Sequence, residues 1–290
     1  MKKSKFCLLV LAVVMVFLYL PIFVLILNSF NASRFGGEWA GFTFNWYSTL
    51  FSARNREIWL SFERSLAVAG VATLGSCILG TTAAMALNRW KDRFQTSHYA
   101  LIYTPLVMPE ILMGISLLMM FTALEMRCGF LTIVIAHITF CVSYVTMTVL
   151  ARLQDFDDRI TEAAYDLGAV PFYTFFHVTL PILLPGIIAG GLLAFTLSID
   201  DFVITFFVTG PGADTLPLKI YSMIKHSKQM PVINSLSTLV LSLTCLLVAA
   251  SCFMSGKRHR RTPGTAPAPS LAASKQRLLA KCARAQGAER

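Results

Sequence analysis

Long apolar runs alternate with short polar segments along this chain. Six of these runs are each about as long as the 20 residues that an α-helix needs to cross a lipid bilayer. They cover residues 6–27, 62–87, 99–124, 130–150, 182–207 and 232–254. The pattern predicts an all-α membrane protein with six transmembrane helices. The second run also carries several small residues, which allow close helix packing.

The first run follows the basic sequence MKKSK at residues 1–5. It is too long for the apolar part of a secretory signal peptide, and it lacks a clear small-residue cleavage site. We therefore predict a retained first transmembrane helix, preceded by a short cytoplasmic N-terminus.

The composition agrees with a membrane location. Hydrophobic residues make up 56% of the 290 residues and charged residues only 14%, whereas soluble domains contain about 25% charged residues. The seven cysteines lie mostly inside apolar runs and lack the paired spacing of disulfides or metal ligands. The formal charge of +10 is spread over loops and a basic tail, which favours topology signals over nucleic-acid binding.

The distribution of lysine and arginine predicts the orientation of the chain. With the N-terminus inside, twelve basic residues fall on the cytoplasmic side and eight on the outer side, leaving aside residues 262–290. Six spans return the C-terminus to the cytoplasm, so both termini are expected there. We predict a membrane domain over residues 6–256 and a basic, disordered tail over 257–290, which contains the sequence TPGTAPAPS.

The most polar segment of the membrane domain spans residues 152–181. Its first half holds five acidic residues and two arginines, while apolar residues such as Ile160 and Leu167 recur at helical spacing. We expect a short amphipathic helix that ends at Gly168 and Pro171. Such a helix either packs on its own bundle or presents its apolar stripe to another protein.

The spacing within this segment is more specific than its composition. The stretch from Glu162 to Pro181 matches the pattern E-A-A-x3-G-x9-I-x-L-P, with Val178 in place of isoleucine. This pattern resembles the cytoplasmic signature loop of permease subunits in ATP-binding-cassette (ABC) importers. The resemblance implies the type I importer (MetI-like) permease fold and a coupling contact with an ATPase. The residues it implies in that contact are Glu162, Ala163, Ala164 and Gly168.

Three acidic residues, Glu110, Asp200 and Asp201, interrupt the apolar runs. An acid at the centre of a membrane helix costs about 2.5–3.5 kcal/mol. Neighbouring helical residues point about 100° apart, so Asp200 and Asp201 face one point only if the helix is broken there. Otherwise one of them faces a pathway while the other caps a helix or pairs elsewhere, and the sequence does not say which. Either the acids pair with a basic or hydroxyl group on another helix, or they bind a cation in a water-filled path. No lysine or arginine lies at membrane depth, which favours the cation.

Three other residues bear on this choice. Ser198 lies within one turn of Asp200 and can add a hydroxyl group to the same site. Trp46, in an aromatic-rich outer loop, can attract a cation to its indole face, although an interfacial aromatic belt is the simpler explanation. His137 is a single histidine in an apolar run, and we expect a packed polar residue there rather than a ligand.

Residues 195–225, FTLSIDDFVITFFVTGPGADTLPLKIYSMIK, narrow the resemblance. They are similar to the second of the two permease subunits in spermidine/putrescine importers, and the similarity extends over residues 1–256. It implies a heterodimer with a second permease subunit, a cytoplasmic dimer of ATP-binding subunits that holds ATP and Mg, and a periplasmic or extracellular polyamine-binding protein. This chain itself is expected to bind no cofactor, no metal and no nucleic acid, and to lie in the lipid of the bacterial inner membrane. The residues implied in the substrate path are Trp46, Glu110, Ser198, Asp200 and Asp201.

Two alternatives stay open on the sequence. The same architecture serves other substrates, such as ferric iron, thiamine or an oxyanion, although intramembrane acids argue against an anion. An ion-coupled secondary transporter is less favoured, because such folds usually show internal repeats and this chain shows no convincing one. The chain also lacks a G-x4-G-K-[ST] phosphate loop, so it is predicted to be a non-catalytic subunit of an ATP-driven transporter.

Overall fold

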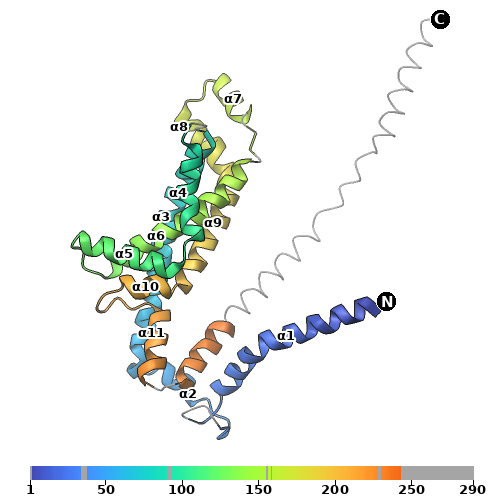
Figure 1. The fold of residues 1–290 in the computed structure, drawn as a ribbon, viewed down its shortest axis with the longest axis vertical. Helices are drawn as coiled ribbons and strands as arrows, with labels where there is room; N and C mark the ends of the chain where they lie inside the picture. The colour runs from blue at the N-terminus through green and yellow to red at the C-terminus, as the bar shows by residue number, and fades with distance from the viewer. Residues whose placement is uncertain are drawn as a thin grey trace, which may run out of the picture. The chain divides into compact units, whose positions relative to one another are not determined.

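The computed structural model describes residues 2–33, 38–89, 93–154, 156–157, 159–227 and 230–242. The described elements are helical apart from one isolated β-bridge between Asn31 and Phe42. In chain order they are α1 Lys2–Ser29, α2 Asn45–Leu50, η1 Ala53–Asn55, α3 Arg56–Arg89, α4 Gln95–Val107, α5 Glu110–Ala123, α6 Phe130–Gln154, α7 Arg159–Asp166, α8 Pro171–Thr174, η2 Phe175–Thr179, α9 Leu180–Asp200, α10 Val203–Val208, α11 Leu216–Ser222, η3 Met223–Ser227 and an unlabelled helix Met230–Ser242 (Figure 1). The predicted all-α class is confirmed.

Four helices of the described chain are long and apolar enough to cross a membrane. They are α1, α3, α6 and the continuous helix Pro171–Asp200, which joins α8, η2 and α9. Together, α4 and α5 make a fifth candidate that is bent by 108° at its break. The predicted sixth span begins in the helix Met230–Ser242, and its residues 243–254 lie outside the described residues, as does the predicted tail 257–290.

The predicted span over residues 99–124 is not one continuous helix. The chain leaves the helix at Met108 (φ −70°, ψ 133°) and resumes it at Glu110. Pro109 explains the break, because proline lacks an N–H group and its ring disfavours the helical conformation of the preceding residue. Glu110 therefore lies at the start of α5, directly after the break.

The predicted span over residues 182–207 also has different bounds. The helix begins at Pro171 and ends at Asp200, and a separate short helix, α10, follows. Asp201 has extended backbone angles (φ −64°, ψ 126°), and its carboxylate accepts hydrogen bonds from N–H groups of α10. Asp201 thus follows the last residue of the span, and its side chain stabilises the start of the next helix, α10.

Helices α3, α6 and α9 pack against one another and form much of the core of the unit Met1–Ser235 (Figure 1). Small residues bring these helices close together. A Cβ atom added to Gly80 of α3 would lie 2.8 Å from the Cβ of Val145 on α6, and one on Gly190 of α9 would lie 3.3 Å from the Cα of Val145. The second unit, Leu236–Arg290, is described only over residues 236–242, which are helical.

Candidate functional site

Two interrupted helices border one cavity in the first unit. The break between α4 and α5 and the break between α9 and α10 both contribute to its wall, together with α6. The cavity has a volume of about 350 Å³. Its wall includes three acidic and three aromatic side chains: Glu110, Asp200, Asp201, Phe140, Tyr144 and Phe202. Acidic groups and ring faces together attract a cation.

Glu110 and Asp200 are the two exposed acids of the cavity. Glu110 is the first residue of α5, and Asp200 is the last residue of α9. Within the described residues, neither carboxylate makes a hydrogen bond or an ion pair with another side chain. Because no protein group compensates their charge there, both carboxylates are available to a bound cation.

Asp201 differs from its neighbour, because its carboxylate is occupied. Oδ1 accepts a hydrogen bond from the backbone N–H of Ile204 at 3.2 Å, and Oδ2 accepts one from the N–H of Thr205 at 2.8 Å. The hydroxyl of Thr205 donates to Oδ2 at 2.7 Å. These bonds satisfy N–H groups of the first turn of α10, which have no partner within that helix. The side chain of Asp201 is only 6% exposed.

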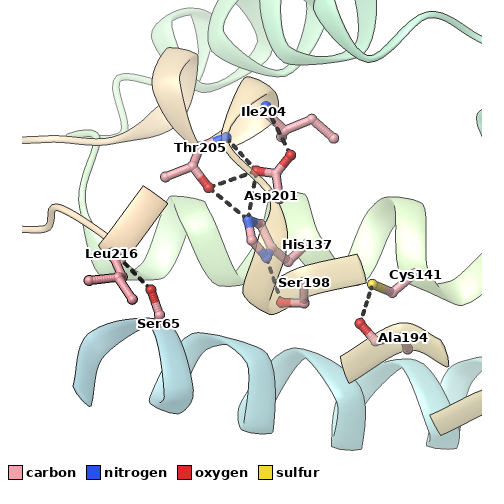
Figure 2. Close-up of polar contacts among 9 residues, drawn as sticks. All are labelled: Ser65, His137, Cys141, Ala194, Ser198, Asp201, Ile204, Thr205 and Leu216. Carbon is pink, nitrogen blue, oxygen red and sulfur yellow. Dashed lines mark hydrogen bonds and ion pairs between the residues drawn. The ribbon is translucent and has the colours of Figure 1, made fainter. Parts of the chain in front are cut away.

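His137 of α6 also contacts Asp201 and Thr205 (Figure 2). Its Nε2 lies 3.0 Å from the hydroxyl oxygen of Thr205 and 3.3 Å from Oδ2 of Asp201. Its Nδ1 lies 2.7 Å from the hydroxyl oxygen of Ser198 on α9. His137 is fully buried, so both ring nitrogens depend on these protein partners for hydrogen bonding.

The structure therefore divides the predicted path residues. Glu110, Asp200 and Asp201 all line the cavity. Ser198 is buried against His137 and is not among the residues that line it. Of the two alternatives for the acids, Asp201 follows the first: it pairs with a basic group, His137, and a hydroxyl group, Thr205, on other helices. Nothing in the sequence identified His137 as the partner of Asp201, because the two residues lie 64 positions apart in the chain (201 − 137).

Trp46 lies apart from this group, in the short helix α2 between α1 and α3. Its indole N–H donates a hydrogen bond to the backbone oxygen of Asn31 at 2.8 Å. The same Asn31 accepts hydrogen bonds at Oδ1 from the N–H groups of Ser33 and Ala40. Trp46 is not among the residues that line the cavity, and its described hydrogen bond serves the loop.

The signature loop forms α7, the turn at Gly168 and then α8. Gly168, where this helix was predicted to end, has φ +82°, a left-handed conformation that glycine adopts readily. The N–H of Gly168 donates to the oxygen of Tyr165, and the N–H of Ala169 donates to the oxygen of Ala164, at 2.8 and 3.0 Å. This pair of bonds is a Schellman motif, which satisfies carbonyl groups at the end of a helix.

The apolar side chains around this turn are exposed. Leu167 is 89% exposed and Phe172 75%. A shallow groove lies beside them, lined by Ala164, Gly168, Tyr173 and Val178, among others. Glu162 and Ala163 are also exposed. Asp155 and Asp158 lie outside the described residues. The exposure of these apolar side chains favours the hypothesis that the helix presents its apolar stripe to another protein over the hypothesis that it packs on its own bundle.

The family described as binding-protein-dependent transport system inner membrane component matches residues 76–256. The chain is 41% identical over 248 residues to the spermidine/putrescine transport system permease protein PotC of Escherichia coli (strain K12), which covers 86% of this chain and 93% of that protein. It is 43% identical over 247 residues to the putrescine transport system permease protein PotI of the same strain, with coverage of 82% and 86%. It is 31% identical over 247 residues to a PotC homolog of Mycoplasma pneumoniae, with coverage of 81% and 86%.

Solved structures with a similar fold include two ABC transporters. A bacterial ABC transporter involved in the import of the acidic polysaccharide alginate has a TM-score of 0.67 at 15% identity, covering 90% of this chain and 96% of the other. The MetNI methionine ABC transporter in an inward-facing conformation has a TM-score of 0.55 at 17% identity, covering 69% and 93%. At these identities the likeness concerns the fold alone, and it confirms the predicted importer permease fold.

Proposed function

Because this chain belongs to the family of inner membrane components of binding-protein-dependent transport systems, we propose that it forms part of the membrane path of an ABC importer for polyamines, spermidine and putrescine. The relatives at 41% and 43% identity carry the names of spermidine/putrescine and putrescine permeases. The observation in the structure that carries the choice of cargo is the cavity whose carboxylates Glu110 and Asp200 have no side-chain partner among the described residues.

The chemistry of a polyamine suits this cavity. Each polyamine carries at least two protonated amines at neutral pH, because alkyl amines have pKa values near 10. Glu110 and Asp200 can each accept hydrogen bonds from one ammonium group. The rings of Phe140, Tyr144 and Phe202 offer apolar contact to the methylene chain and π faces to the charges.

The signature loop supplies the connection to ATP hydrolysis in this proposal. A dimer of ATP-binding subunits, holding ATP and Mg, docks on Glu162, Ala163, Ala164 and the turn at Gly168. A second permease subunit completes the path, and a binding protein delivers the polyamine from outside. The exposure of Leu167 and Phe172 supports a protein contact at this loop. Both chain termini then lie in the cytoplasm.

Other cargoes are less well supported. The carboxylates of Glu110 and Asp200 on the cavity wall disfavour an oxyanion, since like charges repel. Ferric iron prefers a compact set of oxygen or nitrogen ligands, and no group of three metal-ligating side chains that could hold a metal ion occurs among the described residues. A thiamine carrier remains a candidate with the same architecture. Membership of a binding-protein-dependent family disfavours an ion-coupled secondary transporter.

Uptake of radiolabelled spermidine and putrescine tests the proposal in cells that express the whole transporter. Glu110→Gln and Asp200→Asn should each lower polyamine uptake about tenfold, because each removes a charged acceptor. Glu125→Gln is the matched control, since Glu125 is an exposed acid in the loop between α5 and α6 and does not line the cavity. A wild-type transporter that imports neither polyamine would exclude this cargo. Unchanged uptake by both cavity variants would exclude the cavity as the path.

A further inference from the structure

We propose that His137 is a positioning residue: through Asp201 it fixes the break between α9 and α10, and this break directs Asp200 into the cavity. The inference rests on the proposed function only for the cargo that Asp200 meets. The contacts themselves are independent of the cargo. It assigns different tasks to two neighbouring acids, with Asp200 free to bind the cargo and Asp201 retained by the protein.

The first argument is the place of His137 in the fold. It lies on α6, which packs against α3, α9 and α10 in the core of the first unit. His137 is fully buried, and its two ring nitrogens contact α9 on one side and the start of α10 on the other (Figure 2). A single side chain on a packed helix thus connects the two segments that flank the break.

The second argument comes from the directions of the hydrogen bonds. The hydroxyl of Thr205 donates its proton to Asp201, so its oxygen accepts from Nε2–H of His137. Nδ1 then accepts the hydroxyl proton of Ser198 when the ring is neutral. Every donor has one acceptor, and the chain of bonds runs in one direction from Ser198 to Asp201. Such chains strengthen one another in a low-dielectric interior.

The third argument is the effect on Asp200. The backbone turns at Asp201, whose carboxylate is bound to two N–H groups of α10 and lies 3.3 Å from Nε2 of His137. Asp200 precedes this turn directly and is exposed at the cavity wall. Loss of the donor at Nε2 leaves buried acceptors unsatisfied, which favours rearrangement of the turn. The orientation of residue 200 changes with it.

Two amide substitutions of His137 distinguish a role in positioning through hydrogen bonds from a role in filling space. The amide nitrogen of glutamine reaches the place of Nε2 in histidine, whereas the shorter asparagine reaches only the place of Nδ1. His137→Gln therefore retains the donor toward Asp201 and Thr205, and His137→Asn does not. Thr139→Val is the control on the same helix, because Thr139 is exposed and its hydroxyl bonds only to Ile135 of its own helix.

Thiol labelling in the whole transporter complex measures how accessible residue 200 is from the cavity, and it needs no polyamine. Asp200→Cys introduces a thiol at the cavity wall, and a small cationic methanethiosulfonate modifies it at a rate set by access. Peptide mass spectrometry reads this position separately from the native cysteines. Adding His137→Asn should change the rate at least about fivefold, while adding His137→Gln or Thr139→Val should leave it within about twofold.

Several outcomes overturn the proposal. The two amide variants can behave alike, whether both match the wild type or both depart from it equally. Both can also fail to assemble while Thr139→Val assembles, which assigns His137 a purely structural role. Polyamine uptake is a second measurement. His137→Asn should lower uptake about tenfold in the otherwise wild-type transporter, but it should not lower further the residual uptake of the Asp200→Asn variant. An equal effect in both backgrounds overturns action through Asp200. If the labelling pattern holds while neither polyamine is imported, the positioning role stands and the proposed cargo fails.

Discussion

Three glycines on α3 provide a graded test of helix packing. A Cβ atom on Gly70 would have no neighbour within 4 Å, and one on Gly75 would meet the flexible end of Ile138, with Cδ1 at 2.8 Å. One on Gly80 would lie 2.8 Å from Cβ and Cγ1 of Val145 and 3.1 Å from a backbone nitrogen of α6. The same substitution to alanine thus meets open space, a movable side chain and a fixed backbone along one helix.

The expected magnitudes follow from two opposing effects. Alanine is more favourable than glycine in a helix interior by about 1 kcal/mol, and all three variants share this gain. Overpacking a filled contact costs about 1–3 kcal/mol when the neighbours cannot yield. Gly70→Ala should therefore raise the free energy of unfolding by up to about 1 kcal/mol, and Gly75→Ala should leave it nearly unchanged. Gly80→Ala should lower it by up to about 2 kcal/mol.

The thermal unfolding midpoint of the purified transporter in detergent ranks the three variants. We expect Gly70→Ala above the wild type, Gly75→Ala close to it and Gly80→Ala below it. Adding Val145→Ala to Gly80→Ala should recover part of the loss, because it removes the Cγ1 contact. A Gly80→Ala protein as stable as the Gly70→Ala protein would refute the contact between α3 and α6.

Three further predictions concern other positions. A Cβ on Gly210 would collide with a backbone carbonyl in the loop between α5 and α6. Gly210→Ala should therefore reduce the yield of assembled complex on size-exclusion chromatography, whereas Gly129→Ala, with open space around it, should not. Gly168→Ala places a side chain at φ +82°, which costs about 1–2 kcal/mol, and should weaken ATP hydrolysis stimulated by the loaded binding protein. Asp201→Asn should lower the thermal midpoint of the complex more than Asp200→Asn, because only Asp201 holds N–H groups of α10. Equal midpoints would contradict that division.

The predictions that held from the sequence concern local features. Apolar runs long enough to span a membrane do form helices, as α1, α3 and α6 show. The end of the helix at Gly168 could be predicted because glycine, which has no Cβ, readily adopts the left-handed conformation found there. This signal depends on a few neighbouring residues only. That the apolar stripe of this helix faces another protein stays a prediction, which the exposure of Leu167 supports.

Both helix breaks escaped the sequence analysis, for different reasons. Hydropathy is averaged along a run, so it does not register that Pro109 forces Met108 out of the helical conformation. The break at Asp201 depends on His137 and Thr205, and the contact between His137 and Thr205 joins residues 68 positions apart. Periodicity describes one helix at a time, so it cannot assign partners between helices. A division of roles between Asp200 and Asp201 could be expected, but which of them faces the cavity could therefore not be predicted.

The bend of 108° between α4 and α5 also has a consequence for how the protein enters the membrane. The 13 residues of α4 and the 14 residues of α5 each extend about 20 Å, less than the hydrocarbon thickness of about 30 Å. During synthesis the segment is long enough to insert as a single span. α5 packs against α10, and a Cβ on Gly114 would lie 2.6 Å from Cδ2 of Phe207. The chain reaches α10 only after α9 has been made, so the final fold of α5 has to await a segment synthesised about 80 residues later.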